Sequence, residues 1–141
     1  MAKLYQYVDR NGDFDYQSYL GIQKDGNRRK ADVVWSERDN IFHLSQKIRK
    51  YLERVDFGIC HGTRSGIEQV WLEEALNTSV IGTDISAEAV QHGYTLEWDF
   101  HDVKEEWVEA TCFIYSNSWD HSYDPKLCFN NWVSCLRPGG L

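Results

Sequence analysis

The chain has 141 residues, 42% of them hydrophobic, which suffices for one domain with a packed core. Its formal net charge of -7 argues against DNA binding, because affinity for nucleic acid comes largely from lysine and arginine on phosphates. No stretch approaches the roughly 20 apolar residues that span a bilayer, and we see no apolar core of a signal peptide. The cysteines form no C-x-x-C pair and are expected to be reduced and buried: Cys60, Cys112, Cys128 and Cys135. We therefore expect a cytoplasmic protein that binds neither DNA nor a membrane.

Residues 1–39 are expected to form an N-terminal extension or cap. Asn11-Gly12 stands between two runs rich in aromatic residues and indicates a hairpin, because both residues tolerate a positive φ. The polar stretch from Gly21 to Lys30 is predicted to be a surface loop. This loop is either simply solvated or a lid over an anionic group such as a carboxylate.

The next segment alternates helices and strands. Asn40 can cap a helix that runs to about Glu53, with apolar residues at helical spacing. A strand from about Val55 to Cys60, a helix from Ser65 to Leu76 and a strand from Val80 to Thr83 follow. A helix between two such strands is a right-handed crossover, so the strands should be parallel.

The pattern then repeats toward the end of the chain. We expect a brief helix over Ala87–Gln91, strands over Tyr94–Asp99 and Thr111–Tyr115, a short turn or helix over Val103–Val108, and a helix that starts at Asp124-Pro125 and is broken by Pro138-Gly139-Gly140. The elements predict an α/β fold: a doubly wound, mostly parallel, Rossmann-like sheet with helices on both faces. Since the sequence stops where a fifth strand should begin, residues 40–141 are expected to be an incomplete core.

The stretch from Val55 to Asp84 carries the first functional signal. It has the pattern of a strand, a glycine-containing turn, a helix and a second strand that ends on a carboxylate. In an open α/β sheet such a turn lets the backbone approach a ligand, and an acid about 20 residues on can bind a ribose hydroxyl. This pattern predicts a cofactor that contains a nucleoside.

Several stretches, in the correct order, resemble the motifs of class I S-adenosylmethionine-dependent methyltransferases that act on small molecules. They are Gly58-Ile59-Cys60-His61-Gly62-Thr63-Arg64, Asp84, Asp99, Tyr115-Ser116-Asn117-Ser118, Asp120-His121-Ser122-Tyr123-Asp124-Pro125 and Leu136-Arg137-Pro138-Gly139-Gly140-Leu141. The resemblance implies a sheet order 3-2-1-4, truncated before strand five. It also implies that Asp84 binds the cofactor ribose, that Asp99 contacts the adenine, and that Tyr115–Ser118 lies beneath the transferred methyl group.

The first motif departs from the family pattern. Gly58 stands where the family has an acid, and Cys60 and Arg64 replace two of its glycines, so only Gly62 is a motif glycine. Arg64 can instead reach the methionine carboxylate of the cofactor through a charge-assisted contact. The implied cofactor-binding residues are Cys60, His61, Gly62, Thr63, Arg64, Asp84, Ile85, Asp99, Phe100, Ser116 and Asn117. Asp102 could serve in place of Asp99, and either Trp98 or Phe100 could stack on the adenine.

Three histidines follow predicted strands and should approach the same edge of the sheet: His61, His101 and His121. One hypothesis makes His121, or less readily His61, a general base for the methyl acceptor. A second makes the histidines metal ligands, which their spacing does not support, and a third makes them hydrogen-bonded structural residues. Asp120, Tyr123, Trp35 and Trp119 could border the acceptor.

The predicted function is methyl transfer from S-adenosylmethionine to a small-molecule acceptor, without a metal and with His121 as the candidate catalytic residue. Two alternatives stay open: a catalytically degenerate binding module of the same fold, and an NAD-binding Rossmann enzyme. Because the strand Thr111–Tyr115 should be an unpaired apolar edge, we also expect a homodimer through that edge.

Overall fold

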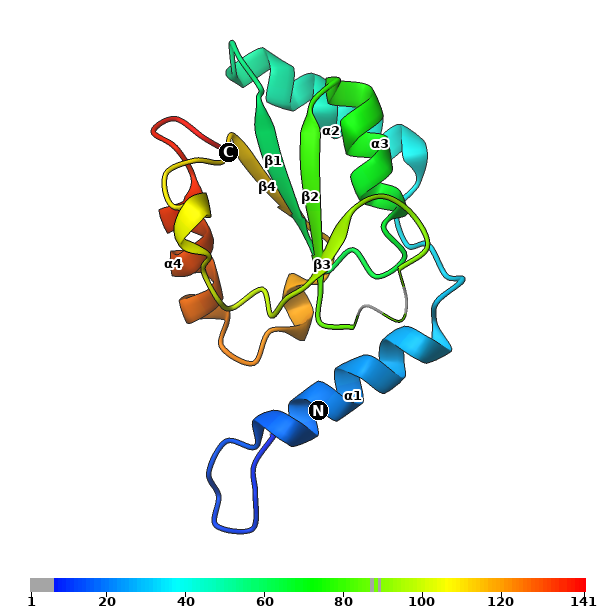
Figure 1. The fold of residues 1–141 in the computed structure, drawn as a ribbon, viewed down its shortest axis with the longest axis vertical. Helices are drawn as coiled ribbons and strands as arrows, with labels where there is room; N and C mark the ends of the chain where they lie inside the picture. Colours follow the sequence, from blue (N-terminus) through cyan, green and yellow to red (C-terminus); the bar gives the residue numbers. More distant parts are fainter. Residues whose placement is uncertain (1–6, 87, 89) are drawn as a thin grey trace, which may run out of the picture.

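The computed structural model of the chain describes residues 7–86, 88 and 90–141, and its centre is a parallel sheet of four strands (Figure 1). The strands are β1 (Phe57–His61), β2 (Ser79–Asp84), β3 (Thr95–Glu97) and β4 (Phe113–Ser116). Their order is β3-β2-β1-β4, and all three neighbouring pairs are parallel. The predicted fold class and strand order are therefore confirmed.

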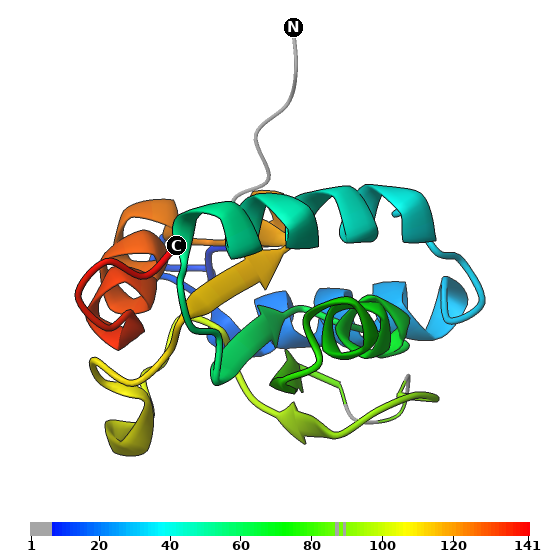
Figure 2. The same ribbon diagram turned by 90° about the horizontal axis from the view of Figure 1, so that it is seen from above.

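Helices cover both faces of this sheet (Figures 1 and 2). The α-helices are α1 (Tyr16–Arg29), α2 (Arg38–Tyr51), α3 (Ile67–Leu76) and α4 (Pro125–Cys135), and two short 3-10 helices are η2 (Glu105–Trp107) and η3 (Trp119–His121). Helices α2 and α3 lie on one face and α4 on the other, while α1 crosses the end at which the strands finish (Figure 1). The brief helix expected over Ala87–Gln91 includes residues 87 and 89, which lie outside the described residues.

Each face of the sheet has its own core, because successive strand residues point to opposite faces. In β1, Cys60 packs with Ile41 of α2 and Leu72 of α3. Its neighbour Ile59 packs on the other side with Trp107 and Cys135. Removing an aliphatic side chain of this size from water stabilises the fold by roughly 1.5–3 kcal/mol. The sheet is thus held between two separate apolar layers.

The start of α4 follows from its own sequence. The Asp124 carboxylate accepts a hydrogen bond from the Leu127 N–H at 3.0 Å, and Pro125 occupies the first helical position. The helix ends at Cys135, shortly before Pro138. This predicted helix is confirmed.

The prediction of a loop over Gly21–Lys30 is wrong, because residues 21–29 belong to α1 and Lys30 is its C-cap. Asp15 caps the helix by accepting from the Ser18 N–H at 3.0 Å, and Arg28 and Arg29 lie in the last turn, where the helix dipole favours cations. Of the expected hairpin before it, the described residues form an antiparallel bridge between Val8 and Phe14.

The edge of β4 is partly occupied by the last residues of the chain. Thr111 O accepts from the Arg137 N–H at 2.9 Å, Cys112 O accepts from the Leu141 N–H at 3.0 Å, and the Ile114 N–H donates to Leu141 O at 2.8 Å. The strand expected as a free edge is therefore hydrogen-bonded over much of its length. All four cysteines are buried and unbridged. None of the helices that the structure describes is long and apolar enough to cross a membrane.

Candidate functional site

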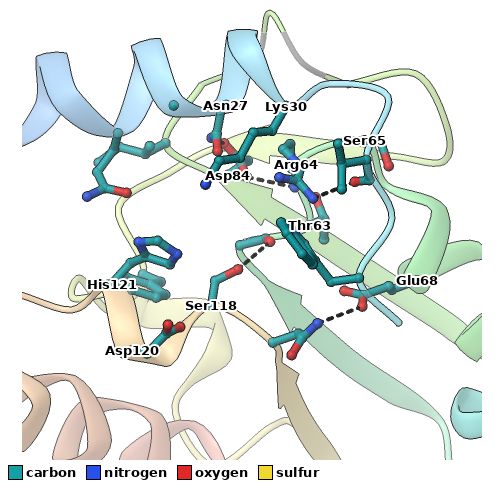
Figure 3. Close-up of a pocket in the computed structure, with 18 of the residues that line it drawn as sticks. Asn27, Lys30, Thr63, Arg64, Ser65, Glu68, Asp84, Ser118, Asp120 and His121 are labelled. Atoms are coloured by element: carbon teal, nitrogen blue, oxygen red, sulfur yellow. Dashed lines mark hydrogen bonds between the residues drawn. The ribbon is translucent and has the colours of Figure 1, made fainter. Parts of the chain in front are cut away.

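A cavity of about 600 Å³ lies between α1 and the ends of the strands (Figure 3). Ligands of open α/β sheets bind outside the carboxyl ends of the strands, and this volume is in the range of small-molecule sites. Asn27 of α1 and Lys30, the C-cap of that helix, enter the cavity from one side. Ser118, Asp120 and His121 border it from the segment after β4 (Figure 3). The turn after β1, the first turn of α3 and the end of β2 complete its wall.

The turn after β1 packs tightly against the segment after β4. Gly62 has a φ of +67°, and a Cβ there would lie 2.6 Å from Ser118 Cβ, so only glycine fits. The Ser118 hydroxyl donates to Gly62 O at 3.0 Å, and the Thr63 N–H donates to Thr83 O at 3.0 Å. These bonds fix the backbone that faces the cavity.

Asp84 ends β2 at the cavity wall with only 3% of its surface exposed. Its Oδ1 accepts from Asn27 Nδ2 at 2.7 Å and from the Ser86 N–H at 2.9 Å, and its Oδ2 accepts from the Arg64 N–H at 2.7 Å. Burial raises the pKa of Asp84, and these hydrogen bonds together with the Arg64 charge oppose that rise. A carboxylate has about four acceptor positions, so Asp84 retains capacity for a further donor.

Two cationic side chains line the same cavity as Asp84, namely Arg64 and Lys30. Arg64 Nη2 donates to Val33 O at 2.6 Å, while its Nε is buried without a hydrogen-bond partner. Lys30 Nζ lies 5.9 Å from the centre of the Trp35 ring. In the described part of the chain neither cation forms an ion pair. This side of the cavity can therefore bind an anionic group.

Glu68, in the first turn of α3, is a further carboxylate of the cavity wall. It is 8% exposed, and its Oε1 accepts from the Tyr115 hydroxyl and from Asn117 Nδ2, each at 3.3 Å. Both donors are neutral and both bonds are long. Glu68 is thus a buried carboxylate that accepts hydrogen bonds from two neutral donors.

Asp99 does not line the cavity. Its Oδ1 accepts from the His101 N–H at 3.0 Å and bonds His101 Nδ1 at 2.6 Å, and its Oδ2 accepts from the Tyr16 hydroxyl at 2.9 Å. Burial alone raises the pKa of Asp99, but the hydrogen bonds from His101 and Tyr16 outweigh it and lower the pKa. The flanking Trp98 and Phe100 do line the cavity.

Only one of the three predicted histidines reaches the cavity, and that one is His121. His61 is buried on the α4 face, where its Nδ1 is 2.7 Å from Thr83 Oγ1 and its ring stacks on Trp132 at 4.9 Å. Burial lowers the pKa of His61 to about 3, so the ring is neutral. His101 is also buried, between Asp99 and Ser122, with its Nε2 2.7 Å from Ser122 Oγ.

No metal site accompanies these histidines. Within residues 7–86, 88 and 90–141, no three His, Cys, Asp or Glu side chains are grouped as ligands.

Comparison with known proteins yields structural matches only. No family model matches the chain, and no curated protein matches its sequence. A Methanococcus maripaludis protein, described as a candidate S-adenosylmethionine-dependent methyltransferase, aligns over 84% of this chain and 61% of its own, with a TM-score of 0.64 and 15% identity. The Burkholderia thailandensis 1,6-didemethyltoxoflavin-N1-methyltransferase, with bound 1,6-didemethyltoxoflavin and S-adenosylhomocysteine, aligns over 87% and 59%, with a TM-score of 0.64 and 14% identity. The chain shares the fold of S-adenosylmethionine-dependent methyltransferases.

A sugar N-methyltransferase from Streptoalloteichus extends this comparison, since it aligns over 99% of this chain, with a TM-score of 0.57 and 14% identity. The alignment covers 57% of that enzyme, so the chain spans about three fifths of the length of the three methyltransferase neighbours.

In this methyltransferase fold, most of the residues that the sequence predicted for the cofactor lie at the cavity. They are Gly62, Thr63, Arg64, Asp84, Ile85, Phe100 and Asn117. Four do not line it: Cys60, His61, Asp99 and Ser116. Strand alternation turns the Cys60 side chain into the core under α2 and α3, and the Ser116 hydroxyl accepts from the Ser118 N–H at 3.1 Å.

Several cavity residues lie outside the set that the sequence predicted for the cofactor, among them the polar residues Asn27, Lys30 and Glu68. Asn27 and Lys30 belong to the polar stretch that was predicted to be a loop, so their direction could not be inferred. Glu68 had a weak signal, because it is a carboxylate beside the apolar residues Ile67 and Val70 of the same helix.

Proposed function

We propose that the chain binds S-adenosylmethionine in this cavity and that the protein transfers its methyl group to a small molecule. The observation that carries the proposal is Asp84, a buried carboxylate with spare acceptor capacity at the end of β2, beside a cavity of about 600 Å³. The Burkholderia neighbour, whose structure holds S-adenosylhomocysteine and a small-molecule substrate, supports the same ligand classes.

The residues at the cavity fit the parts of this cofactor. Asp84 can accept from a ribose hydroxyl, and Ile85 and Phe100 offer apolar surface to the adenine. The turn from Gly62 to Arg64 can approach the methionine part, where the buried Nε of Arg64 still lacks a partner. Each part of the cofactor therefore has complementary groups of this chain.

The protein's own task in such a reaction is to hold and orient. When bound, S-adenosylmethionine supplies an electrophilic methyl group on its sulfonium, so no covalent nucleophile is required from the chain. We propose that the residues around the cavity align the acceptor and exclude water. His121, beside Asp120 on the cavity wall, is the candidate base that takes the acceptor's proton.

Isothermal titration calorimetry with S-adenosylhomocysteine tests the proposal. The wild-type chain should bind, and Asp84→Ala should weaken binding at least tenfold, about 1.4 kcal/mol, because a ribose hydroxyl loses its carboxylate acceptor. Asp39→Ala, which removes an exposed carboxylate of α2, is the matched control and should bind like the wild type. Circular dichroism verifies that each variant is folded.

The same titration separates the alternatives. Absence of S-adenosylhomocysteine binding by the wild type would favour a degenerate module, and binding of NADH instead would favour a Rossmann oxidoreductase. Affinity that survives Asp84→Ala would remove Asp84 from the proposed ribose site.

We also propose, as a separate point, that two copies associate through β4. The support is the apolar character of this edge strand, although Leu141 already pairs with Cys112 and Ile114, which leaves the strand's end at Tyr115 and Ser116 for a partner. Light scattering at several concentrations tests this, and the mass of one chain throughout would contradict it.

A further inference from the structure

Glu68 is a buried carboxylate on the wall of the cavity. Among the residues that the structure describes, no lysine, arginine or histidine forms an ion pair with it. Its two hydrogen bonds come from neutral donors at 3.3 Å. Holding a carboxylate out of water without a cation or strong donors is costly, so such a group in a cavity wall favours a cationic ligand.

The charges around the cavity are complementary to a zwitterion. Lys30 and Arg64 lie at its wall, and neither forms a close ion pair in the described part of the chain. Figure 3 shows Glu68 on a different element, at the first turn of α3. An α-amino acid group carries one ammonium and one carboxylate on the same carbon. The cavity therefore offers a partner of opposite sign for each of the two charges.

We propose that Glu68 binds the ammonium group of the cofactor's methionine part, while Lys30 and Arg64 bind its carboxylate. This inference rests on the proposed function and adds a residue that the sequence did not single out. It also supplies an acid for the cofactor in a chain whose first motif has Gly58 in the place of the family's acid.

The structure explains why the acid cannot stand at position 58. A Cβ at Gly58 would lie 2.2 Å from Phe113 Cζ, so the ring of Phe113 on the neighbouring strand β4 fills the space of any side chain there. Glu68 lies about ten residues further along the chain, on α3, the helix that follows the same strand. Its side chain reaches the cavity from there. The carboxylate is thus supplied from a helix instead of a strand.

A purely structural role for Glu68 makes a different prediction. In that case its function is to accept from Tyr115 and Asn117 and so to fix the end of β4. Glu68→Gln keeps a carbonyl oxygen that can accept both bonds and removes only the charge. The variant therefore separates the ionic role from the structural one.

The experiment is calorimetry with three ligands. S-adenosylhomocysteine carries both charges, its decarboxylated analogue 5′-(3-aminopropylthio)adenosine carries only the ammonium, and 5′-methylthioadenosine carries neither. Glu68→Gln should weaken the first two about tenfold or more and change the affinity for the third by less than twofold, because only the contact with the ammonium is lost. Lys30→Met should weaken only the first.

A matched control keeps the outcome interpretable. Glu74→Gln removes another carboxylate of α3, which pairs with Arg38 at the surface, and should bind all three ligands like the wild type. Equal affinity of Glu68→Gln and the wild type for S-adenosylhomocysteine overturns the inference while leaving the proposed function intact. An equal loss for all three ligands also overturns it, because the effect is then structural. Failure of the wild type to bind any of the three instead contradicts the proposed function.

Discussion

His61 illustrates how burial of a titratable residue makes stability depend on pH. Its pKa falls from 6.5 to about 3 because the ring is desolvated between Thr83 and Trp132. Between those two values the unfolded chain binds a proton that the folded chain does not, so unfolding becomes easier as the pH falls. The free energy of unfolding therefore does not depend on His61 titration above about pH 6.5. Below that pH it declines toward pH 3, by at most about 1.4 kcal/mol per pH unit.

Urea unfolding at pH 7.5, 6.0 and 5.0 measures this decline. His61→Phe keeps an aromatic ring next to Trp132 but cannot titrate, so its free energy of unfolding should fall less steeply with pH than that of the wild type. Parallel curves for the two proteins would show that His61 titrates normally in the folded chain.

Gly58 and Phe113 form a second residue-scale pair. Because a Cβ at position 58 would lie 2.2 Å from Phe113 Cζ, we expect Gly58→Ala to lower the free energy of unfolding by about 1–3 kcal/mol through overpacking. Phe113→Leu should cost stability by itself, yet the double variant should be more stable than the sum of the two losses predicts. Urea denaturation of the four proteins measures this coupling, and strictly additive losses would contradict it.

At the scale of elements, α1 depends on contacts that its own sequence does not reveal. Gly21 and Gly26 lower its intrinsic helix propensity, and this is why the polar stretch resembles a loop. In the fold, Tyr16 donates to Asp99 at 2.9 Å and Asn27 to Asp84 at 2.7 Å, and both acceptors lie more than fifty positions away. By contrast, α4 carries its cap and its proline locally, and so it was predicted correctly.

The hydrogen bond from Tyr16 to Asp99 predicts how readily α1 unfolds locally. Tyr16→Phe removes a hydrogen bond to a largely buried carboxylate, which should cost about 1–2 kcal/mol of local stability and speed amide exchange in α1 by roughly 5- to 30-fold. Arg29→Met removes an ion pair with Asp25 that lies within α1 at the surface, and such pairs contribute little. Hydrogen exchange measured by mass spectrometry should therefore show faster amide exchange in α1 for Tyr16→Phe and almost no acceleration for Arg29→Met. Exchange in α2 should be unchanged in both variants. Equal rates in all three proteins would mean that Tyr16 does not hold α1 in place.

At the scale of the whole molecule, the predicted topology located the site correctly but did not show which residues line it. Parallel strands that finish at one edge placed Asp84 and Asn117 together, and the structure confirms that both line one cavity. Cys60 and His61 were expected there because they follow in the same sequence stretch, but strand alternation buries both side chains in the two cores. Asn27 could not be placed at the site without knowing that α1 crosses the end of the sheet at which the strands finish.

The cavity joins elements from the whole chain, so a ligand that fills it should stabilise the entire fold. Its wall combines α1, the turn after β1, α3 and the segments after β2, β3 and β4. A ligand at a hundred times its dissociation constant stabilises the folded state by about 2.7 kcal/mol, which for a chain of this length raises Tm by roughly 10 °C. We expect S-adenosylhomocysteine to produce this rise in a differential scanning experiment, NADH at the same concentration to produce none, and Asp84→Ala to lose most of it. A rise in Tm with NADH but not with S-adenosylhomocysteine would show that the proposed cofactor is wrong. An undiminished rise in Tm for Asp84→Ala would place the nucleoside away from the end of β2.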